Sequence, residues 1–179
     1  MPSPRVLSSA RGDWQTPPEI VDLIEGFNGG PIDLDPCTVE TNPTRAKEIW
    51  VLPAADGLDQ PWPYGKLVFC NPPFSDMRKW AAKAAQEGRP PVGSEIILLA
   101  VPRTDTAWFR DVWTADALAF WYGSGDKGCP RRSSRLRFIE PSTGEPVPGN
   151  TSPSVFAYWG RRSMRFARTF EPYARVIFP

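Results

Sequence analysis

Residues 66–74 read Lys66-Leu67-Val68-Phe69-Cys70-Asn71-Pro72-Pro73-Phe74. The first five form a short apolar run, which predicts a buried strand. The two prolines fix φ and cannot donate backbone hydrogen bonds, so we expect a stiff turn with free carbonyl oxygens. The Asn71 side chain adds a second acceptor, and Phe74 adds a flat apolar face. Two fixed acceptors beside an aromatic ring suit a planar group with an exocyclic amine, such as a nucleobase.

Apolar runs and helical patterns alternate on both sides of this turn. Further strands are predicted at 31–35, 48–52, 95–101, 117–122, 154–159 and 174–178. Helices are predicted from Pro17 to Asn28, over 77–88, around 108–113 and over 161–169. The run 95–101 is the most apolar, so we expect it to be a central strand buried on both faces. Strands that alternate with helices favour an α/β fold: one Rossmann-like domain whose mainly parallel sheet has antiparallel edge strands.

Local signals predict how several elements begin and pair. Thr16 and Glu19 have the spacing of a capping box, with Pro17 at the first helical position. Ser75–Asp76 and Thr104–Asp105 can cap the next two helices. Residues 136–140 alternate as a strand does, and we expect them to form a hairpin with 154–159.

Composition narrows the classes of function. The 179 residues fit one domain, with 21 basic and 20 acidic side chains and a net charge of +1. The chain has no histidine, which removes His-based triads and His metal sites, and its three cysteines include no CxxC pair. We therefore expect no metal. No apolar stretch has the length of a membrane span, so we expect a cytoplasmic protein without a membrane partner.

Two segments lack periodicity. We expect residues 1–12 to be a flexible arm and 13–179 to form the domain. Residues 123–137 form a long basic loop, and such loops are usually functional. Its cations suit the phosphates of DNA, and they include Lys127, Arg131, Arg132 and Arg135. Arg103, after the central strand, is a further candidate for a phosphate contact. The alternative for all of these is a solvated surface.

Polar residues follow three of the predicted strands. They are Asp33 and Asp35-Pro36, Asn71 to Phe74, and Arg103 to Asp105. Ligands of open α/β sheets bind at the carboxyl ends of strands, near the reversal of strand order. We expect these residues to converge on one cleft.

Five blocks, in this order, resemble the small phage-type DNA adenine N6-methyltransferase family. They are Trp14–Pro17, Leu34–Cys37, Asp56–Leu58, Cys70–Phe74 and Pro102–Phe109. The resemblance implies a Rossmann-like methyltransferase domain that uses S-adenosylmethionine and double-stranded DNA, with 123–137 as its recognition element. It also implies that the Asn71 amide oxygen and the Pro72 carbonyl accept from the target amine. Pro73 then completes the turn, and Phe74 stacks on a base flipped out of the duplex.

The same resemblance implies where the cofactor binds. The matching positions are Trp14, Thr16, Pro17, Asp33, Asp35, Pro36 and Asp56. Asp35 fits the acidic cofactor ligand better than Asp33, and Thr16-Pro17 fits the contact to the cofactor carboxylate at a helix N-terminus. Asp56 fits an acceptor for the cofactor adenine. A common Gly-rich loop after the first strand is absent, and Cys37 is expected to be structural.

Several alternatives stay open at this point. Thr16 can be a plain helix cap, and the acids can simply stabilise turns. A DNA N4-cytosine methyltransferase would also act on an exocyclic amine. A protein-glutamine methyltransferase would use a similar turn without needing the basic loop. A catalytically inactive DNA-binding protein could keep the same fold.

Overall fold

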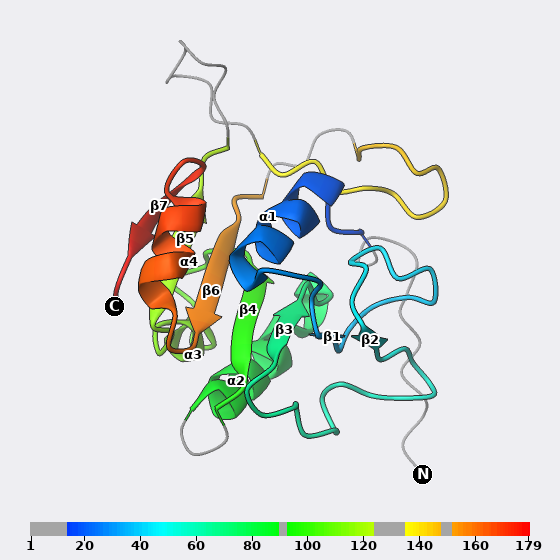
Figure 1. Ribbon diagram of the computed structural model, residues 1–179, viewed down its shortest axis with the longest axis horizontal. Coiled ribbons are helices and arrows are strands. Elements are labelled where there is room, and N and C mark those ends of the chain that lie inside the picture. The colour runs from blue at the N-terminus through cyan, green and yellow to red at the C-terminus, as the bar shows by residue number, and fades with distance from the viewer. Residues whose placement is uncertain (1–13, 90–92, 124–134, 148–151) are drawn as a thin grey trace.

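A single seven-stranded sheet, with strand order β2-β1-β3-β4-β6-β5-β7, forms the centre of the molecule (Figure 1). The computed structural model describes residues 14–89, 93–123, 135–147 and 152–179. The strands are β1 (Leu34–Asp35), β2 (Glu48–Ile49), β3 (Leu67–Cys70), β4 (Glu95–Ala100), β5 (Ala117–Trp121), β6 (Val155–Trp159) and β7 (Ala174–Ile177). The helices are α1 (Pro18–Asn28), α2 (Met77–Gly88), α3 (Phe109–Val112) and α4 (Ser163–Phe170), and a 3₁₀ turn, η1, spans Phe74–Asp76.

Helices cover both faces of the sheet. Figure 1 shows α1 and α4 on the near face, with α2 and α3 behind. In β4, Ile97 and Leu99 belong to the core under α1 and α4, whereas Ile96 and Leu98 belong to the core under α2 and α3. This alternation is the period-two geometry of a strand. The prediction of a central strand buried on both faces is confirmed.

The sheet has a parallel half and an antiparallel half. Strands β2, β1, β3 and β4 run parallel. Strand β6 is antiparallel to both β4 and β5, and β5 is antiparallel to β7. The α/β class is confirmed, but antiparallel pairing among the described strands extends well beyond one edge. From β1 the chain moves outward to β2 and then returns to β3 on the other side of β1. The order therefore reverses between β1 and β3, which is where such folds bind ligands.

The predicted helix caps are wrong. Helix α1 begins at Pro18 without a side-chain cap, since the Thr16 hydroxyl contacts Asn71 instead. Helix α2 begins at Met77, and the Asp76 carboxylate pairs with Lys79 rather than capping the helix. Helix α3 begins at Phe109, four residues after Asp105, also without a side-chain cap. In the first two cases, a side-chain oxygen that could cap has another partner.

The predicted hairpin between 136–140 and 154–159 is also wrong. Strand β6 is buried along its whole length and pairs with β4 and β5. In the 136–140 segment, Ile139 instead forms isolated bridges with Gln15 and Pro146. A fully buried strand gains most by pairing on both sides, so β6 takes two long neighbours in the sheet. The 136–140 segment is left to pair with the residues just before α1.

A polar cluster ties the layers together at the amino end of β4. Arg162 Nε donates to Glu95 Oε1 at 2.8 Å, and the guanidinium lies 4.6 Å from the centre of the Phe27 ring. Tyr158 also donates to Glu95. The cluster joins α1, β4, β6 and the start of α4. It lies at the opposite end of β4 from the carboxyl edge of the sheet.

Two glycines provide a matched test of the packing of α2 against β6. A Cβ on Gly88 would lie 2.5 Å from the Trp159 Cβ, whereas a Cβ on Gly26, in α1, would meet no atom within 4 Å. Gly88→Ala should lower the free energy of unfolding by about 1–3 kcal/mol because α2 must move away from β6. Gly26→Ala should raise it by about 0.5–1 kcal/mol through helix propensity. Urea denaturation of both variants checks this, and a neutral Gly88→Ala would contradict the close approach.

Candidate active site

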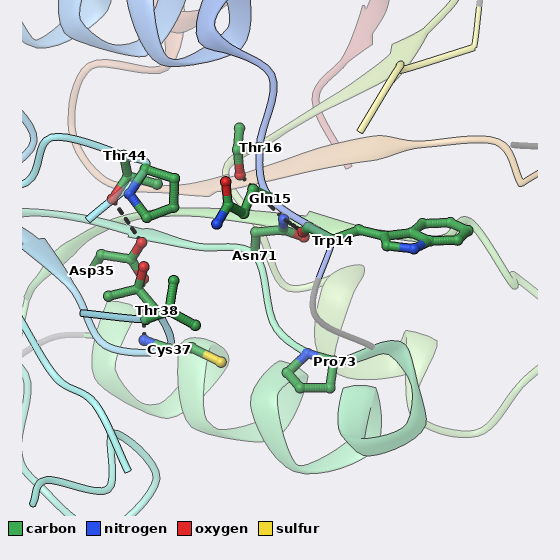
Figure 2. A pocket seen from close by; sticks show the side chains of 11 residues that line it. Trp14, Gln15, Thr16, Asp35, Cys37, Thr38, Thr44, Asn71 and Pro73 are labelled. Atoms are coloured by element: carbon green, nitrogen blue, oxygen red, sulfur yellow. Dashed lines mark hydrogen bonds between the residues drawn. The ribbon is translucent and has the colours of Figure 1, made fainter. Parts of the chain in front are cut away.

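A hollow lies at the carboxyl edge of the sheet, between the ends of β1 and β3. It holds about 420 Å³ of space, part of it open to solvent. Its lining residues are Trp14, Gln15, Thr16, Asp35, Cys37, Thr38, Val39, Pro43, Thr44, Asn71 and Pro73. Figure 2 shows Asp35 and Thr44 on one side, Asn71 and Thr16 on the other, and Gln15 between them. The predicted convergence is confirmed for Asp35 and Asn71, at the first two strand ends, whereas Arg103 to Asp105, at the third, do not line this hollow.

The orientation of the Asn71 amide is determined by its partners. Its Nδ2 donates to the Trp14 carbonyl oxygen at 3.1 Å and to Thr16 Oγ1 at 3.1 Å (Figure 2). A backbone carbonyl can only accept, so the nitrogen of the amide must be the atom that faces Trp14. Both amide hydrogens are thereby used. No donor from the described residues reaches Asn71 Oδ1, which remains open as an acceptor.

The proline turn supplies a second open acceptor. The Pro73 carbonyl accepts from the Asp76 N–H at 3.0 Å and closes η1. No donor from the described segments takes the Pro72 carbonyl oxygen, although Pro72 is buried. Two unclaimed acceptors, Asn71 Oδ1 and Pro72 O, thus come from adjacent residues at the end of β3. A planar donor with two hydrogens is the complement of such a pair.

Three aromatic rings lie around this turn. Phe138 is buried and lies between Phe74, at 6.1 Å in an edge-to-face arrangement, and Trp14, at 5.9 Å. Such ring pairs add to stability beyond the area they bury. Phe74 itself remains partly exposed. Phe138 was not predicted as a site residue, and only the alternation of 136–140 indicated that it would be buried.

Asp35 is the buried acid of the hollow. It is 2 % exposed, and its carboxylate accepts from Thr44 Oγ1 at 2.7 Å and from the Cys37 N–H at 3.1 Å. Burial raises the pKa of Asp35 to about 6, against the opposing effect of hydrogen bonds from Thr44, Cys37 and Thr38. These partners are neutral, and no cation among the described residues pairs with Asp35. A ligand with a positive charge would therefore stabilise the ionised form.

The loop after β1 places Thr44 over Asp35. Asn42 organises it: its Oδ1 accepts from the Ala46 N–H at 3.0 Å, and its Nδ2 donates to the Ala46 carbonyl at 2.9 Å. Asn42 and Arg45 both have positive φ, at 48° and 53°. Positive φ is tolerated by Asn and costly for Arg, so the loop holds a strained shape beside the hollow. Sequence reasoning missed Thr44 because no motif marks it.

Of the other predicted cofactor residues, some line the hollow and some do not. Trp14 and Thr16 line it. Asp33 does not line the hollow, since Lys47 Nζ lies 2.7 Å from one oxygen and the Leu67 N–H donates to the other. Burial acts against its ionised form, but these donors outweigh it and lower the pKa of Asp33. Pro36 and Pro17 are buried, and neither lines the hollow.

Asp56 lies close to the end of β1 through its neighbour Gly57. A Cβ on Gly57 would lie 2.1 Å from the Pro36 carbonyl oxygen, so this contact requires glycine. The Asp56 carboxylate accepts from the Leu58 N–H at 2.9 Å and so stabilises a turn, which is the alternative role that the sequence allows for this acid. Asp56 is thus held near the hollow without lining it.

The predicted DNA-binding residues fall partly outside the described residues, which is the case for Lys127, Arg131 and Arg132. Arg135 is exposed, and its neighbour Leu136 is buried. Arg103 is exposed just beyond the carboxyl end of β4, and no acid among the described residues pairs with it. Both described arginines are therefore available to an anionic partner.

Two further features bear on the kind of site. The described residues contain no group of three His, Cys, Asp or Glu side chains that could hold a metal ion. In the same residues, no helix is long and apolar enough to cross a bilayer. Cys37 packs on the core under α2, where Cys70 is buried, and burial raises the pKa of the Cys70 thiol.

The raised pKa of Asp35 predicts a particular pH dependence of stability. Between the ordinary value of 3.8 and about 6, the folded state binds more protons than the unfolded state. The free energy of unfolding should therefore fall as pH rises through this window, by up to about 3 kcal/mol. Urea denaturation of the wild type and Asp35→Asn at pH 4 to 7 isolates the contribution. Parallel curves for the two proteins would contradict it.

The chain is similar to a described protein family and to a curated protein. It matches the family described as DNA N-6-adenine-methyltransferase (Dam) over residues 4–170. It is also similar to a DNA N-6-adenine-methyltransferase of Escherichia phage T1, with 30% identity over 152 residues, which is 82% of this chain and 62% of that relative. The chain thus spans about three fifths of the length of the curated relative. No solved structure matches it. On the match over residues 4–170, the chain belongs to the DNA N-6-adenine-methyltransferase (Dam) family.

Proposed function

We propose that the protein transfers a methyl group from S-adenosylmethionine to the N6 amine of an adenine in double-stranded DNA. The observation that carries this proposal is the pair of unclaimed acceptors, Asn71 Oδ1 and Pro72 O, beside a hollow that contains the buried acid Asp35. The family and the description of the phage T1 relative support adenine N6 as the acceptor. The reversal of strand order between β1 and β3 supports a Rossmann-like methyltransferase domain.

The turn activates the target by position. The amine donates its two hydrogens to Asn71 Oδ1 and Pro72 O, which draws its lone pair out of conjugation with the ring. When bound, S-adenosylmethionine supplies an electrophilic methyl group, and its sulfur leaves as a neutral thioether. The amine nitrogen forms the new bond to carbon and then loses one proton to water. Asn71 thus contributes by orientation and by stabilising the positive charge that develops on the nitrogen.

Asp35 is the residue that we assign to the cofactor. Its two oxygens can accept about four hydrogen bonds, and three neutral donors are present. Asp35 lines the hollow, so the remaining position suits the cationic ammonium group of the cofactor. Thr44 and the Cys37 N–H hold the carboxylate in place for this contact. The N-terminus of α1 offers less, because Pro17 and Pro18 have no N–H group.

DNA would approach from the edge that carries Arg103 and Arg135. Both are exposed, and Arg135 belongs to the basic segment 123–137 that we assign to DNA recognition. The residues that follow this segment contact the catalytic turn through Phe138, which packs on Phe74. Phe74 keeps part of its ring exposed, and we assign it to stacking on the flipped adenine.

Transfer of tritiated methyl groups to duplex DNA tests this function. Asn71→Ala removes one acceptor and should lower the transfer rate at least about 100-fold, while binding of S-adenosylmethionine stays within about threefold of wild type. Gln86→Ala, which removes an exposed amide at the far end of α2, is the matched control and should transfer at the wild-type rate.

The modified base decides between the related activities. Digestion of the labelled DNA and mass spectrometry of the nucleosides should find N6-methyladenine. Label in N4-methylcytosine would replace adenine by cytosine as the target. A protein that binds DNA without any transfer would be a binding module, and transfer that survives Asn71→Ala would remove Asn71 from the mechanism.

A further inference from the structure

The geometry points to Thr16 as a positioning residue for methyl transfer: its Oγ1 and the Trp14 carbonyl hold the Asn71 amide with Oδ1 toward the target amine. This inference rests on the proposed function. It differs from a cofactor contact and from a helix cap, the two roles that the sequence favours for Thr16. Neither role uses the contact with Asn71, which lies 55 residues along the chain.

The Asn71 amide needs such partners because its terminal torsion is soft. The χ2 angle of asparagine is broad and roughly two-fold, so the side chain alone does not select between Oδ1 and Nδ2 facing the substrate. The flipped amide would present N–H groups to the target amine, which is itself a donor. The Trp14 carbonyl excludes this state, since flipping would set Oδ1 against another acceptor. The Thr16 hydroxyl accepts the second Nδ2 hydrogen and so holds the selected amide in place.

The segment that carries the two partners is held firmly. The Gln15 N–H donates to the Ile139 carbonyl at 2.9 Å, and the Ile139 N–H donates to the Gln15 carbonyl at 3.0 Å. Thr16 is 3 % exposed, and α1 begins two residues later. The Trp14 ring packs on Phe138. The acceptors for Asn71 therefore belong to a fixed frame rather than to a loose loop.

Two substitutions at Thr16 separate the hydroxyl from the shape of the side chain. Thr16→Val keeps the branched shape and removes the acceptor, whereas Thr16→Ser keeps the hydroxyl. Thr169→Val, on α4, removes a hydroxyl whose hydrogen bond among the described residues stays within its own helix, and it serves as the matched control. If Thr16→Val does not fold, Thr16→Ala takes its place.

The first measurement is the single-turnover rate of methyl transfer with saturating S-adenosylmethionine and duplex DNA. Thr16→Val should lower this rate about 10- to 100-fold, as expected for misplaced reacting groups. Thr16→Ser should stay within about threefold, and Thr169→Val should match wild type. A Thr16→Val variant with a wild-type saturated rate and only weaker cofactor binding would overturn the inference and make Thr16 a cofactor residue.

The second measurement does not need activity. The side-chain amide of Asn71 gives a pair of ¹H–¹⁵N signals that Asn71→Ala identifies by their loss. In Thr16→Val these signals should shift and their hydrogens should exchange faster with water, whereas Thr16→Ser should preserve them. Unchanged signals in Thr16→Val would overturn the inference. Wild-type protein that fails to methylate DNA would instead refute the proposed function, and the amide signals would still decide whether Thr16 holds Asn71.

Discussion

The hydrogen bond from Asn71 Nδ2 to the Trp14 carbonyl oxygen is the contact on which the rest of the site depends. Because a carbonyl cannot donate, this bond fixes which end of the amide is free. The same bond joins the end of β3 to the chain just before α1. The bridge from Gln15 to Ile139 then connects this part of the chain to Phe138 and to the residues that follow the basic segment. One polar contact thereby links the Asn71 to Phe74 turn, the start of the first helix and the edge that we assign to DNA.

The main feature on the opposite side of the hollow is the buried carboxyl group of Asp35. Asp35 has three neutral donors and no cation among the described residues, so its ionised form is costly until a cationic ligand arrives. The strained loop around Asn42 keeps Thr44 over the carboxylate. Asn71 and Asp35 come from adjacent parallel strands, at the point where the strand order reverses. The topology thus brings the turn that we assign to the target amine and the acid that we assign to the cofactor to the same opening.

The sequence predicted the parts of the fold that depend on burial and failed where tertiary contacts compete for polar groups. Strand β4 could be predicted because a long apolar run buried on both faces has few alternatives. The cap at Thr16 could not, because its hydroxyl serves Asn71, a residue distant in sequence. Asn71 to Phe74 and Asp35 could be predicted as site residues because they lie at the ends of predicted strands. Thr44 and Phe138 could not, since their positions come from loop shapes that no local pattern specifies.

In the mechanism that we propose, Asn71 presents its oxygen, and not its nitrogen, to the target amine. A crystal structure of the protein with duplex DNA and a non-reactive analogue of S-adenosylmethionine tests it most directly. We predict that the exocyclic nitrogen of a flipped adenine lies about 3 Å from both Asn71 Oδ1 and the Pro72 carbonyl oxygen, with Nδ2 still bonded to Trp14. An adenine amine bonded elsewhere, or an Asn71 amide that has left the Trp14 carbonyl, would contradict it.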